Sequence, residues 1–180
     1  AEADMTVWDA QVYREKKQYQ DAISLYQKGA EIYSVQMKTA VKADEKKASA
    51  DAMESALLAT IETGELSKDQ GLLVSAYDSY LALSVDRKRE IEVLYQKAHI
   101  TYEKGDHGVA AEQMRSIAFM TQAKSPDALK VRTQAADLAL DALVLLKDDE
   151  KIEKWAKDFA QLFPKEAADY AKVARKSVLT

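Results

Sequence analysis

Apolar residues recur every three or four positions along nearly the whole chain, which is the pattern of helices with one buried face. The first stretch carries Val7, Trp8, Val12 and Tyr13, and the second carries Tyr19, Ala22, Tyr26, Ala30, Tyr33 and Met37. No segment shows a strand-like alternation that competes with this spacing. The pattern predicts an all-α protein of about nine helices.

Turn and cap residues divide the predicted helices into hairpins. Gly64 is expected to end one helix as a C′ glycine, and Ser67 to Gln70 reads as a capping box that starts the next. Gly105-Asp106 predicts a turn, and Ser125-Pro126 predicts a helix start in which proline occupies the first helical position. We therefore expect hairpins at about 4–42, 48–84, 87–122 and 127–163, followed by a last helix at 165–178.

Two further boundaries depend on polar residues and proline. Asp86 is a plausible N-cap for the helix that runs to Lys104, and Asp148-Asp149 begins a helix that Pro164 terminates. The segment 42–49 is polar but contains nothing that forces a break. The residues 19–62 can therefore be one very long helix or two helices joined by a turn in this segment.

A spacing of 34 residues relates two of these hairpins. Ala76 and Ala110 are 34 positions apart, and so are Tyr80 and Met114. Each pair is a small residue followed four positions later by a large apolar one, and Ala22 and Tyr26 repeat this signature. A small residue permits close helix approach, and the large one fills the gap between successive hairpins.

With this signature the chain resembles the tetratricopeptide repeat (TPR) family. The first unit matches the family pattern at Ala10, Tyr13, Tyr19, Ala22, Tyr26 and Gly29, and the third at Ala98, Gly105, Asp106, Ala110 and Met114. In the third unit Tyr102 comes one place late and His107 replaces the aromatic residue of the turn. The resemblance implies one domain over residues 1–180, a right-handed superhelix of stacked antiparallel hairpins. The alternative is an irregular helical bundle.

Composition and charge argue against several classes of function. The 180 residues are 47% hydrophobic and 31% charged, and their net charge of −4 argues against general nucleic-acid binding. No apolar run approaches the length of a membrane span. The absence of cysteine removes disulfides and thiolate sites. The chain begins at Ala1 without a methionine, so we expect either an excised piece or a mature form.

The sequence contains no recognisable catalytic or cofactor motif. His99 and Glu103 lie four apart on one helix, but a metal needs three or four ligands and no second cluster accompanies them. His107 is expected to be a solvated turn residue, and Asp148 to Glu150 a charged helix start. We therefore expect neither an enzyme nor a bound cofactor or metal.

The resemblance also implies a set of partner-binding residues. In the family the first helix of each hairpin lines a concave groove, and the contact positions would here be Gln11, Arg14, Glu92, Tyr95, His99 and Tyr102. Tyr95, His99 and Tyr102 share one helix face in any case, because they lie at positions i, i+4 and i+7. Tyrosine and histidine suit a binding surface, but the same stripe can also belong to the core.

Two functional hypotheses follow. The first is a non-catalytic scaffold that binds a peptide or protein partner in the groove. A likeness to repeat proteins of Gram-negative envelopes favours a periplasmic or envelope location over a cytoplasmic one. The second is a structural protein that self-associates as a homodimer, with Tyr26, Ala30, Tyr33 and Met37 along the dimer seam.

Overall fold

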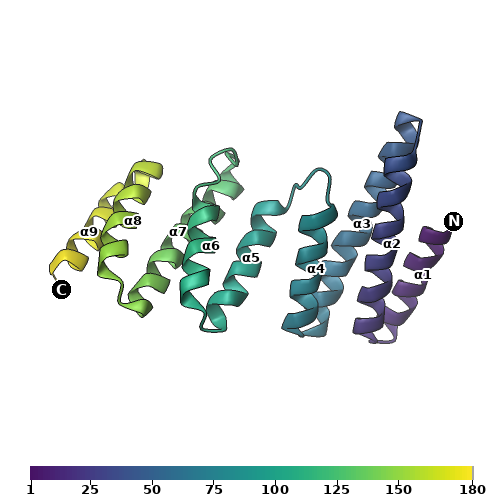
Figure 1. Cartoon of the computed structure of the whole chain (residues 1–180), viewed down its shortest axis with the longest axis horizontal. Helices are drawn as coiled ribbons and strands as arrows, with labels where there is room; N and C mark the ends of the chain where they lie inside the picture. Colours follow the sequence, from purple (N-terminus) through teal and green to yellow (C-terminus); the bar gives the residue numbers. More distant parts are fainter. Residues whose placement is uncertain (180) are drawn as a thin grey trace. The chain divides into compact units, whose positions relative to one another are not determined.

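The computed structural model describes residues 1–179 and shows an all-α protein (Figure 1). Over these residues there are nine α-helices, one short 3-10 turn and no strand, so the predicted class and helix number are confirmed. The α-helices are α1 (Glu2–Glu15), α2 (Tyr19–Thr39), α3 (Ala43–Ser67), α4 (Gln70–Leu83), α5 (Glu90–Glu103), α6 (His107–Ala118), α7 (Pro126–Leu146), α8 (Asp149–Leu162) and α9 (Ala167–Leu179), with the turn η1 (Pro164–Glu166) before α9.

The helices gather into two compact units, Ala1–Lys88 and Arg89–Thr180. In the first unit, α2 contacts α1, α3 and α4. In the second, α7 contacts α5, α6 and α8, and α9 packs against α8. Each unit has its own apolar core. The small-then-large signature lies in these cores, because its six residues, Ala22, Tyr26, Ala76, Tyr80, Ala110 and Met114, are all at most 1% exposed.

The four turns within hairpins each contain one left-handed residue. A left-handed residue directly follows the first helix or its C-cap in each of them, and these residues are Lys17, Lys68, Gly105 and Lys147. In three of the turns the left-handed residue donates its N–H to the carbonyl three residues back, and the next residue donates to the carbonyl five back. This is the Schellman pattern, in which glycine is the usual residue.

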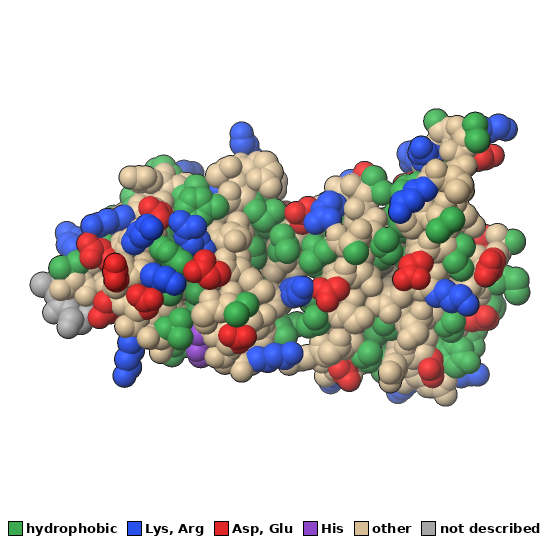
Figure 2. Space-filling view, viewed as in Figure 1, with side chains coloured by type: hydrophobic (Ala, Val, Ile, Leu, Met, Phe, Trp, Pro, Cys, Tyr) green, Lys and Arg blue, Asp and Glu red, His purple; other side chains and the backbone are tan. Residues whose placement is uncertain are grey.

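The turn between α2 and α3 resolves the question of a single long helix. The chain breaks at residues 40–42, where Ala40 and Lys42 are extended, and Ala43 already begins α3. The expected turn over 42–49 is therefore wrong in position. With 21 and 25 residues, α2 and α3 are longer than their 14-residue neighbours α1 and α4. Basic, acidic and apolar side chains cover their projecting tip (Figure 2).

Two predicted boundaries between α3 and α5 are also wrong. Helix α3 passes Gly64 and ends at Ser67, whose hydroxyl donates to the Gly64 carbonyl at 2.6 Å. Asp69 rather than Ser67 caps α4, since its Oδ1 accepts the N–H of Leu72 at 3.1 Å. Gly64 instead provides room for α4, because a Cβ there would lie 3.1 Å from the Leu73 Cα.

Before α5, the N-cap is Arg89 rather than Asp86. Ser84 holds this loop, donating to Glu54 at 2.8 Å and accepting the N–H of Arg87 at 3.1 Å. The boundaries around α7 and α8 are confirmed. Ser125 Oγ accepts the N–H of Ala128, with Pro126 in the first turn, and Asp148 caps α8 by accepting from Lys151. Side-chain caps thus fix both helix starts.

Candidate binding surface

Tyr95, His99 and Tyr102 form a continuous row of rings along α5. The ring centroids of Tyr95 and His99 are 6.1 Å apart, and those of His99 and Tyr102 are 6.5 Å apart. The row continues to His107, the first residue of α6, whose ring meets Tyr102 edge-on at 5.1 Å. We call these four residues the aromatic row. His107 is therefore half-buried in the row rather than a solvated turn residue.

The aromatic row is partly core and partly surface. Tyr95 and Tyr102 pack against the core of the second unit but remain half-exposed. The side chain of His99 is 39% exposed, and its Nδ1 lies 3.3 Å from Glu103 Oε1. The same side chains thus contribute to the core and also leave part of their surface exposed, so the core alternative of the sequence holds in part. Such rings bury area on one side and offer polar tips on the other.

Helices α7 and α9 place further polar side chains near the row. The hydroxyl of Tyr170 on α9 donates a hydrogen bond to Asp137 Oδ1 on α7 at 3.0 Å. Burial raises the pKa of Tyr95, and the negative charge of Asp137 raises it further. Asp137 is thus electrostatically coupled to the aromatic row while it bonds Tyr170. We call the surface carrying the row, Asp137, Asp141 and Asp169 the α5–α7–α9 face, and Tyr170 is buried beneath it.

Three carboxylates on this face lack a cationic partner. Asp137, Asp141 and Asp169 form no ion pair with any residue described by the structure. Desolvation by the surrounding helices raises the pKa of Asp137, the Tyr170 hydrogen bond opposes that rise, and Asp141 and Asp169 add to it. Desolvation also raises the pKa of Asp141. Both side chains are nevertheless largely exposed, so the face keeps uncompensated negative charge that a ligand can reach.

The other predicted partner-binding residues are Glu92, Gln11 and Arg14. Glu92 lies on α5 but pairs with Arg89 at 2.7 Å. Gln11 and Arg14 lie on α1, in the other compact unit. Gln11 is exposed, whereas the Arg14 guanidinium is 2.6 Å from Glu62 Oε1 on α3 and is bonded to the Tyr26 hydroxyl. Arg14 therefore links three helices of its own unit.

Sequence reasoning missed Asp137 on the face and Tyr170 beneath it. A usable signal was present, because Asp137 and Asp141 lie one helical turn apart in a segment that is otherwise alanine and leucine. A pair of acids on an apolar helix marks the side that leaves the core. Tyr170 gave no such signal, since its spacing fits a packed face equally well.

Neither a metal-binding group nor a membrane-spanning helix is found among the residues that the structure describes. Within residues 1–179, no three His, Asp or Glu side chains gather closely enough to form a metal-binding group. The same residues include no helix with the length and hydropathy needed to span a membrane. The α5–α7–α9 face presents aromatic surface, hydrogen-bonding tips and negative charge.

Comparison with known proteins adds no relative to this description. No protein-family model, curated protein or solved structure matches the chain.

Proposed function

We propose that this protein is a non-catalytic interaction scaffold that binds a peptide segment of a partner protein across the α5–α7–α9 face. The observation that carries the proposal is the aromatic row, four adjacent half-buried rings of which Tyr95 interacts electrostatically with Asp137, a carboxylate without a cationic partner. Rigid aromatic side chains contribute contact area to an interface with little loss of side-chain entropy, which is why they concentrate at binding hot spots.

The proposal includes the repeat architecture that the sequence suggested. The small-then-large pairs occupy equivalent buried sites in α2, α4 and α6, and the four hairpin turns share a left-handed residue. These regularities support a TPR-like array of stacked hairpins that forms a right-handed superhelix, with the α5–α7–α9 face in its concave groove. A bacterial envelope location belongs to the same proposal and depends on the repeat resemblance alone.

The charge of the face indicates the chemistry of the partner. Lysine or arginine in the bound segment would compensate Asp137 and Asp141, and the same cations can rest on tyrosine rings. An extended segment suits the row, because successive side chains can meet successive rings. We therefore propose a peptide with at least one basic residue next to an apolar one.

Three of the four residues proposed for the seam of a homodimer are buried within their own unit. Tyr26, Ala30 and Tyr33 are at most 8% exposed and face their own unit, so they cannot line a dimer interface. Met37 is only half-exposed. An interface between copies would need another surface.

A peptide-display selection followed by NMR tests the scaffold proposal. Random peptides are selected on the wild-type chain, and the best binder is titrated while the imidazole signals of His99 and His107 are recorded. These are the only two histidines, so the signals report on the row without further labelling. We expect enriched Lys and Arg, and shifts of both signals at saturating peptide.

Matched variants distinguish binding at the α5–α7–α9 face from a general effect of the negative charge of the protein. An Asp137→Asn/Asp141→Asn variant should lose about tenfold or more in affinity, as expected when a desolvated charge contact is removed. The control, Asp44→Asn/Glu45→Gln at the start of α3, removes the same charge and should bind normally. Selection of peptides without basic residues, or binding that leaves both histidine signals unmoved, would refute the proposal.

A further inference from the structure

We propose that copies of this chain associate head to tail, with the outer face of α1 from one copy seated in the groove between α8 and α9 of the next. This contact is independent of the α5–α7–α9 face. It joins two surfaces that differ in shape and in charge.

The outer face of α1 is an apolar stripe that no residue described by the structure covers. Ala3, Thr6 and Ala10 are the buried residues of this helix. Met5 and Trp8 face away and are 69% and 66% exposed, and the half-buried Val12 continues their line one turn later. Apolar side chains appear along the edge of the molecule where α1 lies (Figure 2). A tryptophan this exposed favours an interface, because few side chains bury more apolar area.

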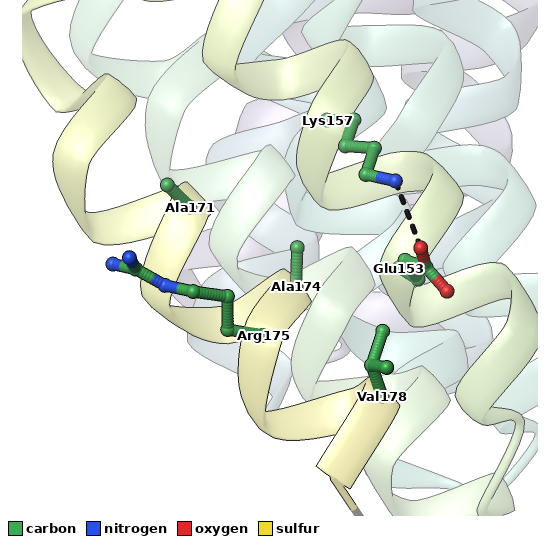
Figure 3. Close-up of a pocket in the computed structure, with 6 residues that line it drawn as sticks. All are labelled: Glu153, Lys157, Ala171, Ala174, Arg175 and Val178. Carbon is green, nitrogen blue, oxygen red and sulfur yellow. Dashed lines mark hydrogen bonds and ion pairs between the residues drawn. The ribbon is translucent and has the colours of Figure 1, made fainter.

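The receiving groove lies between α8 and α9 (Figure 3). It is lined by Glu153 and Lys157 of α8 and by Ala171, Ala174, Arg175 and Val178 of α9, and it encloses about 480 Å³. The alanines make a shallow apolar floor, and Val178 is 62% exposed at one end. Glu153 and Lys157 pair with each other at 2.8 Å along one wall. Small residues on the floor leave room for a large side chain from outside, which α1 supplies in Trp8.

The charges of the two surfaces favour a contact between α1 of one copy and α9 of another over a contact between two copies of the same helix. Residues 1–13, which include most of α1, carry Glu2, Asp4 and Asp9 and no Lys or Arg. Helix α9 carries Lys172, Arg175 and Lys176 against the single acid Asp169. Two copies of α1 therefore repel each other, as do two copies of α9, whereas α1 and α9 attract. A contact between unlike surfaces leaves one free stripe and one free groove, so association continues into chains or closes into a ring.

A mixing experiment with full-length chains tests this geometry. Trp8→Ala removes the centre of the stripe, and Ala171→Glu fills the groove with a charged side chain. Both positions are exposed, and circular dichroism verifies that the variants fold. Ala168→Glu places the same change on an exposed part of α9 outside the groove lining and serves as the control. Sedimentation velocity is measured over a concentration series for each chain and for the mixture of the two interface variants.

The expected result is specific to a head-to-tail contact. The wild-type chain and Ala168→Glu increase in mass with concentration, and each interface variant alone stays monomeric. The mixture forms a dimer and nothing larger, since only the Ala171→Glu stripe and the Trp8→Ala groove remain intact. In a Trp155→Phe background, association should also shift the emission of Trp8 to shorter wavelength.

Three results would overturn the proposal. A wild-type chain that stays monomeric at the highest concentration shows that the two surfaces do not bind each other, whatever else covers them. Association of Ala171→Glu alone shows a contact that bypasses the groove. Two exposed charges on the proposed contact surfaces give a second test. Asp9→Lys and Arg175→Glu should each weaken association, and unchanged association of both also contradicts the proposal.

Discussion

Lys147 and Gly105 occupy the same position in two hairpin turns, and both are left-handed, with φ of 57° and 88°. Their N–H groups donate to carbonyls three residues back, Lys147 to Val144 and Gly105 to Tyr102. Only one of the two residues is a glycine. The other carries a Cβ in a conformation that L-residues resist.

This equivalence predicts opposite effects of two substitutions. Lys147→Gly should raise the free energy of unfolding by about 0.5–1 kcal/mol, because relief of the left-handed strain exceeds the entropy cost of glycine. Gly105→Ala should lower it by about 1 kcal/mol. Urea unfolding followed by circular dichroism measures both changes. A stabilised Gly105→Ala would show that the turn does not require this conformation.

Two helical glycines should respond to alanine with opposite signs. A Cβ on Gly29 would lie 2.7 Å from Val7 Cγ2, so either the Val7 side chain would have to rotate or α1 and α2 would have to move apart. Gly108 in α6 has open space around it. We expect Gly108→Ala to stabilise by about 0.5–1 kcal/mol through helix propensity, and Gly29→Ala to destabilise by about 1–3 kcal/mol through overpacking. Thermal unfolding of the two variants measures these changes in stability. Equal shifts in Tm would contradict the close approach of α1 and α2.

The hydrogen bond from Tyr170 to Asp137 predicts a third contrast. Tyr170→Phe should cost about 1 kcal/mol, because it leaves Asp137 without its donor. Asp137→Asn keeps the accepting oxygen and removes repulsion from Asp141 and Asp169, so it should be neutral or slightly stabilising at pH 7. Denaturant unfolding at low salt measures both. A loss of the same size in Asp137→Asn would mean that Asp137 is paired with a cation after all.

The pH dependence of stability above pH 10 should report on Tyr33. Burial, and after it the hydrogen bond to Asp4 and the charge of Asp4, together raise its pKa from 10.0 to about 12. Below pH 10 both the folded and the unfolded chain hold the proton. Between pH 10 and 12 the unfolded chain loses it while the folded chain keeps it, so the free energy of unfolding falls as the pH rises.

Tyr33→Phe should make this alkaline loss of stability shallower without abolishing it, since Tyr170 shifts in the same direction. Asp4→Asn is the matched variant, because it removes the negative charge and keeps an accepting oxygen. For Asp4→Asn, the slope of the free energy of unfolding against pH should lie between those of the wild type and Tyr33→Phe. Urea titrations at several pH values from 9 to 11.5 give the slopes. Identical slopes in all three proteins would contradict the shift.

Helix starts marked by specific chemistry were predictable from the sequence. Ser125-Pro126 and Asp148 mark their helices because a side-chain acceptor and a preset φ act locally. The break after α2 was harder to place, because Ala40, Val41 and Lys42 are ordinary residues that turn the chain without glycine or proline. That turn depends on tertiary packing, since it lets the apolar stripes of α2 and α3 face each other. Gly64 failed as a helix end for the same reason, because α4 rather than a turn requires its small size.

The candidate site also has one part that a local sequence pattern predicts and another part that depends on tertiary packing. The aromatic row was predictable because its first three members lie on one helix at fixed spacing. Asp137 on the face and Tyr170 beneath it come from two other helices, and no local pattern reveals which helices become neighbours. The pairing of Arg14 with Glu62 had no local signal either, because Glu62 lies 48 residues away on α3.

The order of contacts along the chain has a kinetic consequence. Within each unit the helices touch mainly their neighbours in sequence, or the next helix but one, as α2 touches α4 and α5 touches α7. Little loop-closure entropy is then lost before a hairpin gains its packing, and chains with such local contacts fold quickly. Amide hydrogens should accordingly exchange hairpin by hairpin, with the terminal helices α1 and α9 opening first.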